Sequence, residues 1–300
     1  MPSDDAPHAP DSSLAALVHL LADDHVEVVE AVRTKLVEMG EKVIPYLQQV
    51  NVSHADPKVR VEAKGVLERI RLEGVGRVWE GSVSPADREP DLEGSIFLMA
   101  RVCYPEMNPT MYQLKLDQMA ERIRPRLLAA KTPAGKLSAM NRVLFDEERF
   151  QGNWTDYFDP QNCYLNRVLD RKLGIPITLS AVYLLVARRI DFPILGVGVP
   201  GHFMVKYRDD ETEIYVDPFN GGRLFTRPEC VQFIVESGYP YQPEFLDGVG
   251  SREILARILR NLILVYVDRH EMTLQRTLSR FLELLDTDSS PGGKAGANFE

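Results

Sequence analysis

The sequence lacks the features that mark several common functional classes. Its 300 residues include only three cysteines, Cys103, Cys163 and Cys230, which are widely separated and odd in number. This pattern fits neither a disulfide framework nor a cysteine zinc site, and it favours a reducing compartment. Long runs of Lys and Arg are also missing, and the formal net charge is -9. Phosphate contacts need a basic patch, so we predict no binding to nucleic acid.

Membrane and metal signals are absent as well. No apolar run approaches the roughly 18 residues of a membrane span. The first residues, MPSDDAPHAPDSS, contain neither the basic nor the apolar part of a signal peptide. The histidines at positions 19, 25, 54 and 270 have no ligand-spaced partners. We therefore predict a cytoplasmic protein without a membrane contact, a metal or a cofactor, and the sequence leaves the oligomeric state open.

The apolar pattern that is present divides the chain into segments. Residues 13–74 follow helical spacing, and two sets of apolar residues share it: Val28, Val32 and Leu36, then Val59, Ala63 and Leu67. With the stretch DPKVR at residues 56–60, this segment resembles HEAT-type helical repeats. Glycines and prolines mark the other boundaries. We predict disordered tails at 1–12 and 288–300, a linker at 75–90, a main domain at 91–248 and a helical pair at 249–287.

Residues 200–217 carry the pattern of a β-hairpin. One strand covers residues 200–208, the other covers 211–217, and Asp209 and Asp210 form the turn between them. Opposite charges then face one another across the strands, which stabilises a sheet. The predicted register gives three pairs: Arg208 with Glu211, Lys206 with Glu213, and His202 with Asp217.

The third pair suggests chemistry. A carboxylate opposite a histidine can bind one ring nitrogen and fix the tautomer of the imidazole. Such a histidine is what an activated nucleophile needs as its general base. The alternative is that the His202–Asp217 hydrogen bond only braces the end of a sheet.

A longer set of residues points to a family. These motifs are GN at 152–153, DY at 156–157, DP at 159–160, N at 162, YLN at 164–166, VL at 168–169, R at 171, GIP at 174–176, PGHF at 200–203 and DPFNGG at 217–222. In these motifs the chain resembles the SirB1 family of transglutaminase-like proteins over about residues 92–285. The resemblance implies a papain-like α+β fold, with a helix packed on an antiparallel sheet, and C-terminal helices similar to tetratricopeptide (TPR) repeats. It also implies a nucleophile at a helix start, with His202 and Asp217 on adjacent strands.

The nucleophile is the point of departure from that family. The helix that should begin with cysteine begins here with Pro176, Ile177 and Thr178. Thr178 and Cys163 are the candidates that remain, with Ser180 as a weaker one. Thr178 is equally a helix cap, and Cys163 lies near a predicted helix start at Asp159, which would lower its pKa.

Further residues are candidates for binding. They are Asn162, Asn166, Ser180 and Trp154. The two asparagines are also suited to satisfying loop backbone groups. The sequence supports two hypotheses: a degenerate, pseudoenzyme-like module that binds a peptide or protein, or an amide hydrolase or acyl transferase that uses His202 and Asp217 with a Cys or Thr nucleophile. A purely architectural role is a third.

Overall fold

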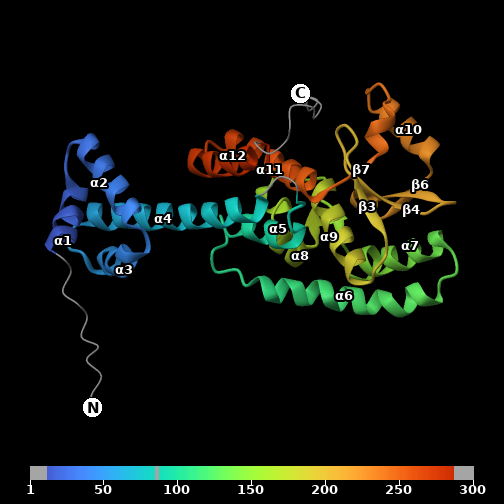
Figure 1. Cartoon of the computed structure of the whole chain (residues 1–300), viewed down its shortest axis with the longest axis horizontal. Helices are drawn as coiled ribbons and strands as arrows, with labels where there is room; N and C mark the ends of the chain where they lie inside the picture. Colours follow the sequence, from blue (N-terminus) through green and yellow to red (C-terminus); the bar gives the residue numbers. More distant parts are fainter. Residues whose placement is uncertain (1–11, 85–87, 287–300) are drawn as a thin grey trace, which may run out of the picture. The chain divides into compact units, whose positions relative to one another are not determined.

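The computed structural model describes residues 12–84 and 88–286 (Figure 1). The predicted disordered tails fall almost entirely outside these residues. The chain separates into two compact units, Met1–Val78 and Trp79–Glu300. Each unit has its own buried apolar residues.

The first unit is helical. It contains α1 (Ser12–His19), α2 (Val26–Met39), α3 (Ile44–Ser53) and most of α4 (Pro57–Val83), with short 3-10 turns between them. Val32 and Leu36 of α2 and Val59 and Ala63 of α4 lie in one apolar core. The recurrent apolar positions of the sequence therefore face a common interior. This finding shows packed helices and leaves their HEAT character a prediction.

The predicted start of the linker is wrong in one respect. Helix α4 continues through Gly74 and Gly81 to Val83, although the sequence predicted a linker from residue 75. A glycine inside a helix costs only about 1 kcal/mol relative to alanine, which neighbouring helical residues offset. Irregular backbone begins after Val83.

The second unit combines helices with a sheet, as predicted for an α+β fold. The helices before the sheet are α5 (Leu92–Ala100), α6 (Pro109–Ala129), α7 (Pro133–Asn141), α8 (Leu165–Arg171) and α9 (Pro176–Arg189). A π-helical turn, η3 (Arg142–Glu147), follows α7. Helices α5, α6 and α7 begin at N-cap residues. The side chains of Asp91, Asn108 and Thr132 each accept a backbone N–H from the first turn of the helix that follows.

The helix predicted from Asp159 to about residue 172 is interrupted. Asp159 does accept the N–H of Gln161 at 3.0 Å, but it opens only a 3-10 turn, η4 (Pro160–Asn162). Cys163 and Tyr164 separate this turn from α8. Cys163 is therefore not in the first turn of a long helix, and the predicted helix-dipole effect on its thiol is lost.

The main sheet has five antiparallel strands in the order β6-β5-β4-β3-β7. They are β3 (Ile194–Val197), β4 (Met204–Arg208), β5 (Glu213–Asp217), β6 (Arg223–Phe225) and β7 (Gly248–Val249). A separate parallel pair joins β1 (Gln151–Gly152) to β2 (Leu173–Gly174). The predicted hairpin is β4 and β5.

The register of that hairpin differs from the predicted one by two residues. Arg208 pairs with Glu213 and Lys206 with Tyr215. The turn is centred on residues 210 and 211, because the Asp209 N–H donates to the Thr212 carbonyl at 3.0 Å. The Asp209 carboxylate also accepts the N–H groups of Glu211 and Thr212, at 3.0 and 2.7 Å. An aspartate that bonds the backbone two and three residues ahead fixes where the turn occurs.

Both faces of the sheet are covered. Phe203, Val205 and Val216 are buried on the face that α9 contacts. Met204 and Tyr215 lie on the other face, in a cluster with Cys230 and Ile234 of α10 (Arg227–Glu236). Figure 1 shows α9 and α10 on opposite sides of the strands. Helix α10 begins with a capping box, in which Glu229 accepts the Thr226 N–H at 2.7 Å.

Two helices follow the sheet, as predicted: α11 (Ser251–Asp268) and α12 (Met272–Asp286). They pack on one another, and Phe281 of α12 stacks on Trp79 with ring centroids 4.9 Å apart. Their resemblance to TPR repeats remains a prediction. Within residues 12–84 and 88–286, no helix combines the length and the apolar character needed to cross a membrane.

Candidate functional site

His202 and Asp217 are in direct contact. The Nε2 atom of His202 lies 2.9 Å from Oδ2 of Asp217. The observed register, extended by one residue, places Asp217 opposite Met204. His202 is therefore a diagonal neighbour on the same face of the sheet, within reach of a long side chain. The predicted His202–Asp217 contact is present, but the two residues are diagonal neighbours across the strands and not directly opposed.

The Asp217 carboxylate is held by three further hydrogen bonds. Its Oδ1 accepts the N–H groups of Phe219 and Asn220 at 3.0 and 3.3 Å, and its Oδ2 accepts the Asn220 side-chain amide at 2.7 Å. The side chain is completely buried. Burial alone would raise the pKa of Asp217, but the hydrogen bonds and charge from His202, with those from Asn220, bring it below its ordinary value. Asp217 is thus an anion whose lone pairs are all engaged.

An ionised carboxylate only accepts hydrogen bonds, so Nε2 of His202 carries a proton. In the neutral ring, Nδ1 is then an acceptor. Among the residues that the structure describes, no hydrogen bond to Nδ1 is present. The ring itself contacts Phe219 and Phe233, with centroids 6.0 and 5.5 Å away, and the side chain is 11% exposed. The imidazole can therefore offer one nitrogen to a bound group.

The loop of residues 217–222 depends on two glycines. A Cβ at Gly222 would lie 2.5 Å from Cγ of Asn141, and Gly222 has φ +79°. A Cβ at Gly152 of β1 would lie 2.5 Å from the ring of Phe219. Both positions need glycine, because the backbone approaches a side chain too closely for a Cβ. The DPFNGG and GN motifs thus meet around Phe219.

Phe219 is buried and connects His202 to an aromatic surface formed by Trp154, Tyr157 and Phe158. The Trp154 ring lies 4.4 Å from that of Phe219, and Tyr157 bridges Phe219 and Phe158 at 6.1 and 5.4 Å. Trp154 is 69% exposed and Phe158 is 67% exposed. Large aromatic side chains so exposed on one surface are typical of an interaction site.

Asn162 holds the loop that carries these rings. Its Nδ2 donates to the carbonyls of Asp156 and Tyr157 at 2.7 and 3.1 Å, and its Oδ1 accepts Nδ2 of Asn153 at 3.0 Å. Asn162 is fully buried. It therefore supports the loop and does not face a ligand. This is the loop-satisfying alternative that the sequence left open.

The second predicted asparagine, Asn166, lies on α8 and is also buried. Its Oδ1 has no hydrogen-bond partner among the described residues. Nothing in its contacts connects it with His202.

The hydroxyls of α9 are engaged in structure. Thr178 Oγ1 donates to the Asn162 carbonyl at 2.7 Å and accepts the Ile175 N–H at 3.2 Å. Ser180 Oγ lies 3.4 Å from the Phe203 carbonyl. Both side chains are buried. Within the described part of the chain, neither hydroxyl bonds to the His202 ring.

The Cys163 thiol is buried. Burial, with a smaller effect of Asp159, raises the pKa of Cys163 to about 12. Its Sγ makes no hydrogen bond with His202 in the described residues. The structure thus brings His202, Asp217 and Trp154 together around Phe219, and within the described residues neither Cys163 nor Thr178 is hydrogen-bonded to the His202 ring.

Three residues that contribute to the site were not predicted from the sequence. Phe219 and Asn220 appear in the sequence only as part of the DPFNGG motif. Their position two and three residues after Asp217 could have indicated that they donate hydrogen bonds to its carboxylate. Arg257 of α11 donates from Nη1 to the His202 carbonyl at 2.8 Å. No local pattern connects residues so far apart in the chain, so Arg257 was not predictable.

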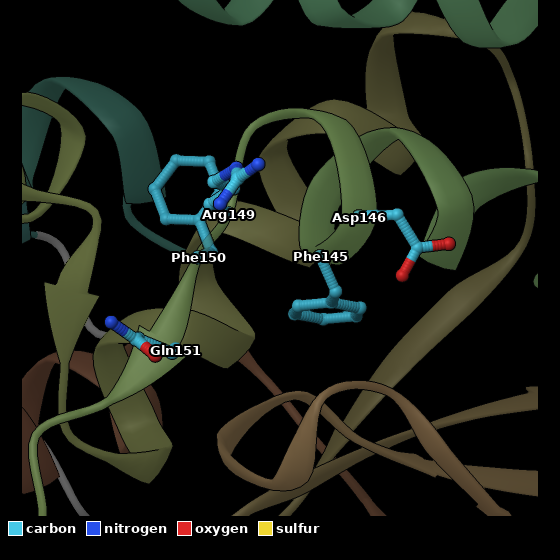
Figure 2. Close-up of a pocket in the computed structure, with 5 residues that line it drawn as sticks. All are labelled: Phe145, Asp146, Arg149, Phe150 and Gln151. Carbon is cyan, nitrogen blue, oxygen red and sulfur yellow. The ribbon is translucent and has the colours of Figure 1, made fainter.

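A pocket of about 290 Å³ lies beside the loop of residues 217–222 (Figure 2). Its lining residues are Phe145, Asp146, Arg149, Phe150 and Gln151. In the view of Figure 2, Asp146 lies on one side of the Phe145 ring, with Arg149 and Phe150 on the other. The pocket adjoins the loop at Gly222, where a Cβ would be 2.6 Å from the Phe145 ring. His202 does not line the pocket, so we base the site on the His202–Asp217 contact. Within the described residues, no group of three His, Cys, Asp or Glu side chains is arranged to hold a metal ion.

Comparison with known proteins places this site in a family context. The model of the transglutaminase-like superfamily matches residues 110–260, which include His202, Asp217 and Arg257. A UPF0162 protein of Xylella fastidiosa is 34% identical over 220 residues, covering 69% of this chain and 76% of that protein. A UPF0162 protein of Vibrio cholerae is 26% identical over 192 residues, covering 62% and 70%. F-box only protein 21 of Homo sapiens is 30% identical over 209 residues, covering 60% of this chain but 33% of that protein. No solved structure matches significantly.

Proposed function

Because this chain belongs to the transglutaminase-like superfamily, we propose that its second unit is a SirB1-type domain that binds a peptide or protein segment without turning it over. The single observation that carries the proposal is the His202–Asp217 pair, to whose ring no nucleophile of the described residues is hydrogen-bonded. A site that keeps the orienting groups and lacks the attacking group is suited to recognition.

The chemistry of Cys163 supports the absence of turnover. Only the thiolate attacks a carbonyl. Burial raises the pKa of Cys163 to about 12, so the thiol form predominates at neutral pH. The Thr178 hydroxyl is a weak nucleophile without an adjacent base, and it already donates to Asn162 while its oxygen accepts from Ile175. Attack by Thr178 would first break these buried bonds, at about 1–3 kcal/mol for each group left unsatisfied.

The exposed rings supply the binding surface. Trp154 and Phe158 present large apolar faces to solvent, and the buried Phe219 ring beneath them contacts both Trp154 and the His202 ring. The imidazole Nδ1 would accept one N–H of the bound segment. Exposed aromatic side chains of this kind commonly contribute most of the binding energy once a partner buries them.

The flanking helices fit the same role as further interaction surfaces. We infer that residues 13–74 are HEAT-like repeats, supported by the shared core of α2 and α4. The pair α11 and α12 would be a shortened TPR-like element. The domain limits at residues 91 and 248 are part of this proposal, as is a cytoplasmic location, which the three free thiols favour.

An immobilised array of 15-residue peptides tests the proposal. We expect selected peptides to bind the wild-type protein and to lose at least about tenfold in affinity with Trp154→Ala or Phe158→Ala, equivalent to ~1.4 kcal/mol. Leu128→Ala is the matched control, because Leu128 is an exposed apolar residue of α6, outside the proposed binding surfaces. Equal loss in the control would contradict a specific surface.

Mass spectrometry of the same peptides decides between binding and catalysis. We expect their masses to be unchanged after incubation with the protein, in the presence or absence of a primary amine. The alternative is an amide hydrolase or acyl transferase, favoured by the anionic Asp217 that orients His202. Hydrolysis or amine incorporation that disappears in His202→Ala would establish that alternative and overturn the binding proposal.

A further inference from the structure

Arg257 lies beneath the turn that carries His202. Its guanidinium makes two hydrogen bonds to that turn: Nη1 donates to the His202 carbonyl at 2.8 Å, and Nη2 donates to the Val199 carbonyl at 3.2 Å. The side chain is 18% exposed. It comes from α11, a helix that the sequence suggested was a separate C-terminal element.

The turn needs an external donor of this shape. The His202 N–H donates to the Val199 carbonyl at 3.2 Å, and Gly201 between them has φ +69°. Neither carbonyl lies in a strand, because β3 ends at Val197 and β4 begins at Met204. A planar guanidinium presents several N–H groups in a fixed fork, so it can satisfy two neighbouring carbonyls at once. An ammonium group lacks that planar fork.

Contacts around the guanidinium extend to the aromatic part of the site. Its Cζ lies 5.5 Å from the centroid of the Phe203 ring, and a Cβ at Gly198 would lie 3.4 Å from Cζ. Burial raises the pKa of Tyr157, and the positive charge of Arg257 opposes this rise. Tyr157 itself contacts Phe219 and Phe158. Arg257 thus contacts the His202 turn directly and acts on Tyr157 of the aromatic loop through its charge.

We propose that Arg257 is a positioning residue that sets the orientation of the His202 imidazole relative to the aromatic surface. Helix α11 is then an integral part of the binding site and not only an appended interaction element. The effect on peptide affinity rests on the proposed binding function, whereas the orientation of His202 does not. The two are therefore measured separately.

The first measurement is the NMR spectrum of the protein labelled with ¹⁵N at histidine. The ring signals of His202 are identified by their loss in His202→Gln. We expect Arg257→Lys and Arg257→Met both to shift these signals and to weaken the nuclear Overhauser contact between His202 and Phe219. Arg260→Met is the matched control, since Arg260 lies one turn further along α11 and is 43% exposed. Its spectrum should match that of the wild type.

Arg257→Lys keeps the charge and most of the volume, so it separates positioning from folding should Arg257→Met fail to fold. Unshifted His202 signals in folded Arg257→Lys would overturn the proposal. The second measurement is peptide affinity, where Arg257→Lys should cost about tenfold. Wild-type protein that binds no peptide would reject the proposed function alone, because the His202 signals still decide the role of Arg257. Shifted signals with unchanged affinity would overturn the link between orientation and binding.

Discussion

The Nε2 atom of His202 lies 2.9 Å from Oδ2 of a completely buried Asp217, which also accepts three hydrogen bonds from its own 3-10 turn. We expect Asp217→Asn to lower the free energy of unfolding at pH 7 by roughly 2–4 kcal/mol. The Asn side chain would replace one carboxylate oxygen by an NH₂ group, which would face a hydrogen-bond donor because every partner of Asp217 is a donor. Urea unfolding of both proteins measures the difference.

The same substitution should show a defined pH dependence. The pKa of Asp217 in the folded protein is lower than the ordinary value of 3.8, since the hydrogen bonds outweigh burial. A lowered carboxyl pKa stabilises the fold above the unfolded value, and this stabilisation is lost as the pH falls through the folded value. The difference between wild type and Asp217→Asn should therefore shrink below about pH 3.8. A difference that stays constant on acidification would show that the charge of Asp217 contributes nothing.

The hairpin shows how much of the site was accessible from the sequence. Alternation along residues 200–217 identified the strands and the faces of the side chains. The register could not be deduced, because it depends on which aspartate side chain bonds the turn backbone. An error of two residues keeps every side chain on its face, since the strand period is two. For this reason His202 still reaches Asp217 and Lys206 still reaches Glu213.

Other parts depended on contacts between distant segments. Arg257 was placed in an amphipathic helix, which is correct, but its donation to the His202 carbonyl has no local signature. The environment of Cys163 was inferred from a predicted helix start that proved to be a short 3-10 turn. Burial then decides the pKa of this thiol, and burial depends on packing from the whole unit. Local patterns identify elements, and long-range packing sets their chemistry.

Thiol labelling distinguishes the three cysteines. Burial raises the pKa of both Cys163 and Cys230 to about 12, whereas Cys103 is partly exposed. We expect iodoacetamide at pH 7.5 to label Cys103 first in the folded protein, with the other two reacting at least about 100-fold more slowly. Peptide mass spectrometry gives the rate at each position.

Denatured protein, in which all three thiols should react alike, is the control for that labelling. Fast reaction of Cys163 in the folded protein, slowed by His202→Ala, would identify a histidine-activated thiolate and contradict both the prediction and the proposed binding role.

Lys206 is a buried cation with a structural task. Its Nζ donates to the Leu246 carbonyl at 2.6 Å and to Glu213 at 3.1 Å, and only 2% of the side chain is exposed. We expect Lys206→Met to reduce the free energy of unfolding by about 1–3 kcal/mol, because Leu246 loses its donor while Glu213 keeps Arg227. Lys35→Met removes an exposed pair with Glu38 and should cost less than about 0.5 kcal/mol. Equal stability of the two variants in urea would show that burial of Lys206 has no energetic consequence.

Substitutions at Thr178 test whether its hydroxyl has a structural or a catalytic role. Its Oγ1 donates to the Asn162 carbonyl and accepts the Ile175 N–H, and Thr178→Val removes both bonds from a buried position. We expect Thr178→Val to lower the free energy of unfolding by about 1–3 kcal/mol and Thr178→Ser to lower it less. Thr277→Val, at an exposed site on α12, should change stability by under about 0.5 kcal/mol. Peptide affinity should be the same in folded Thr178→Val and Thr178→Ser, because the hydroxyl faces the helix start and not the His202 ring. Turnover present in Thr178→Ser and absent in Thr178→Val would instead identify this hydroxyl as a nucleophile.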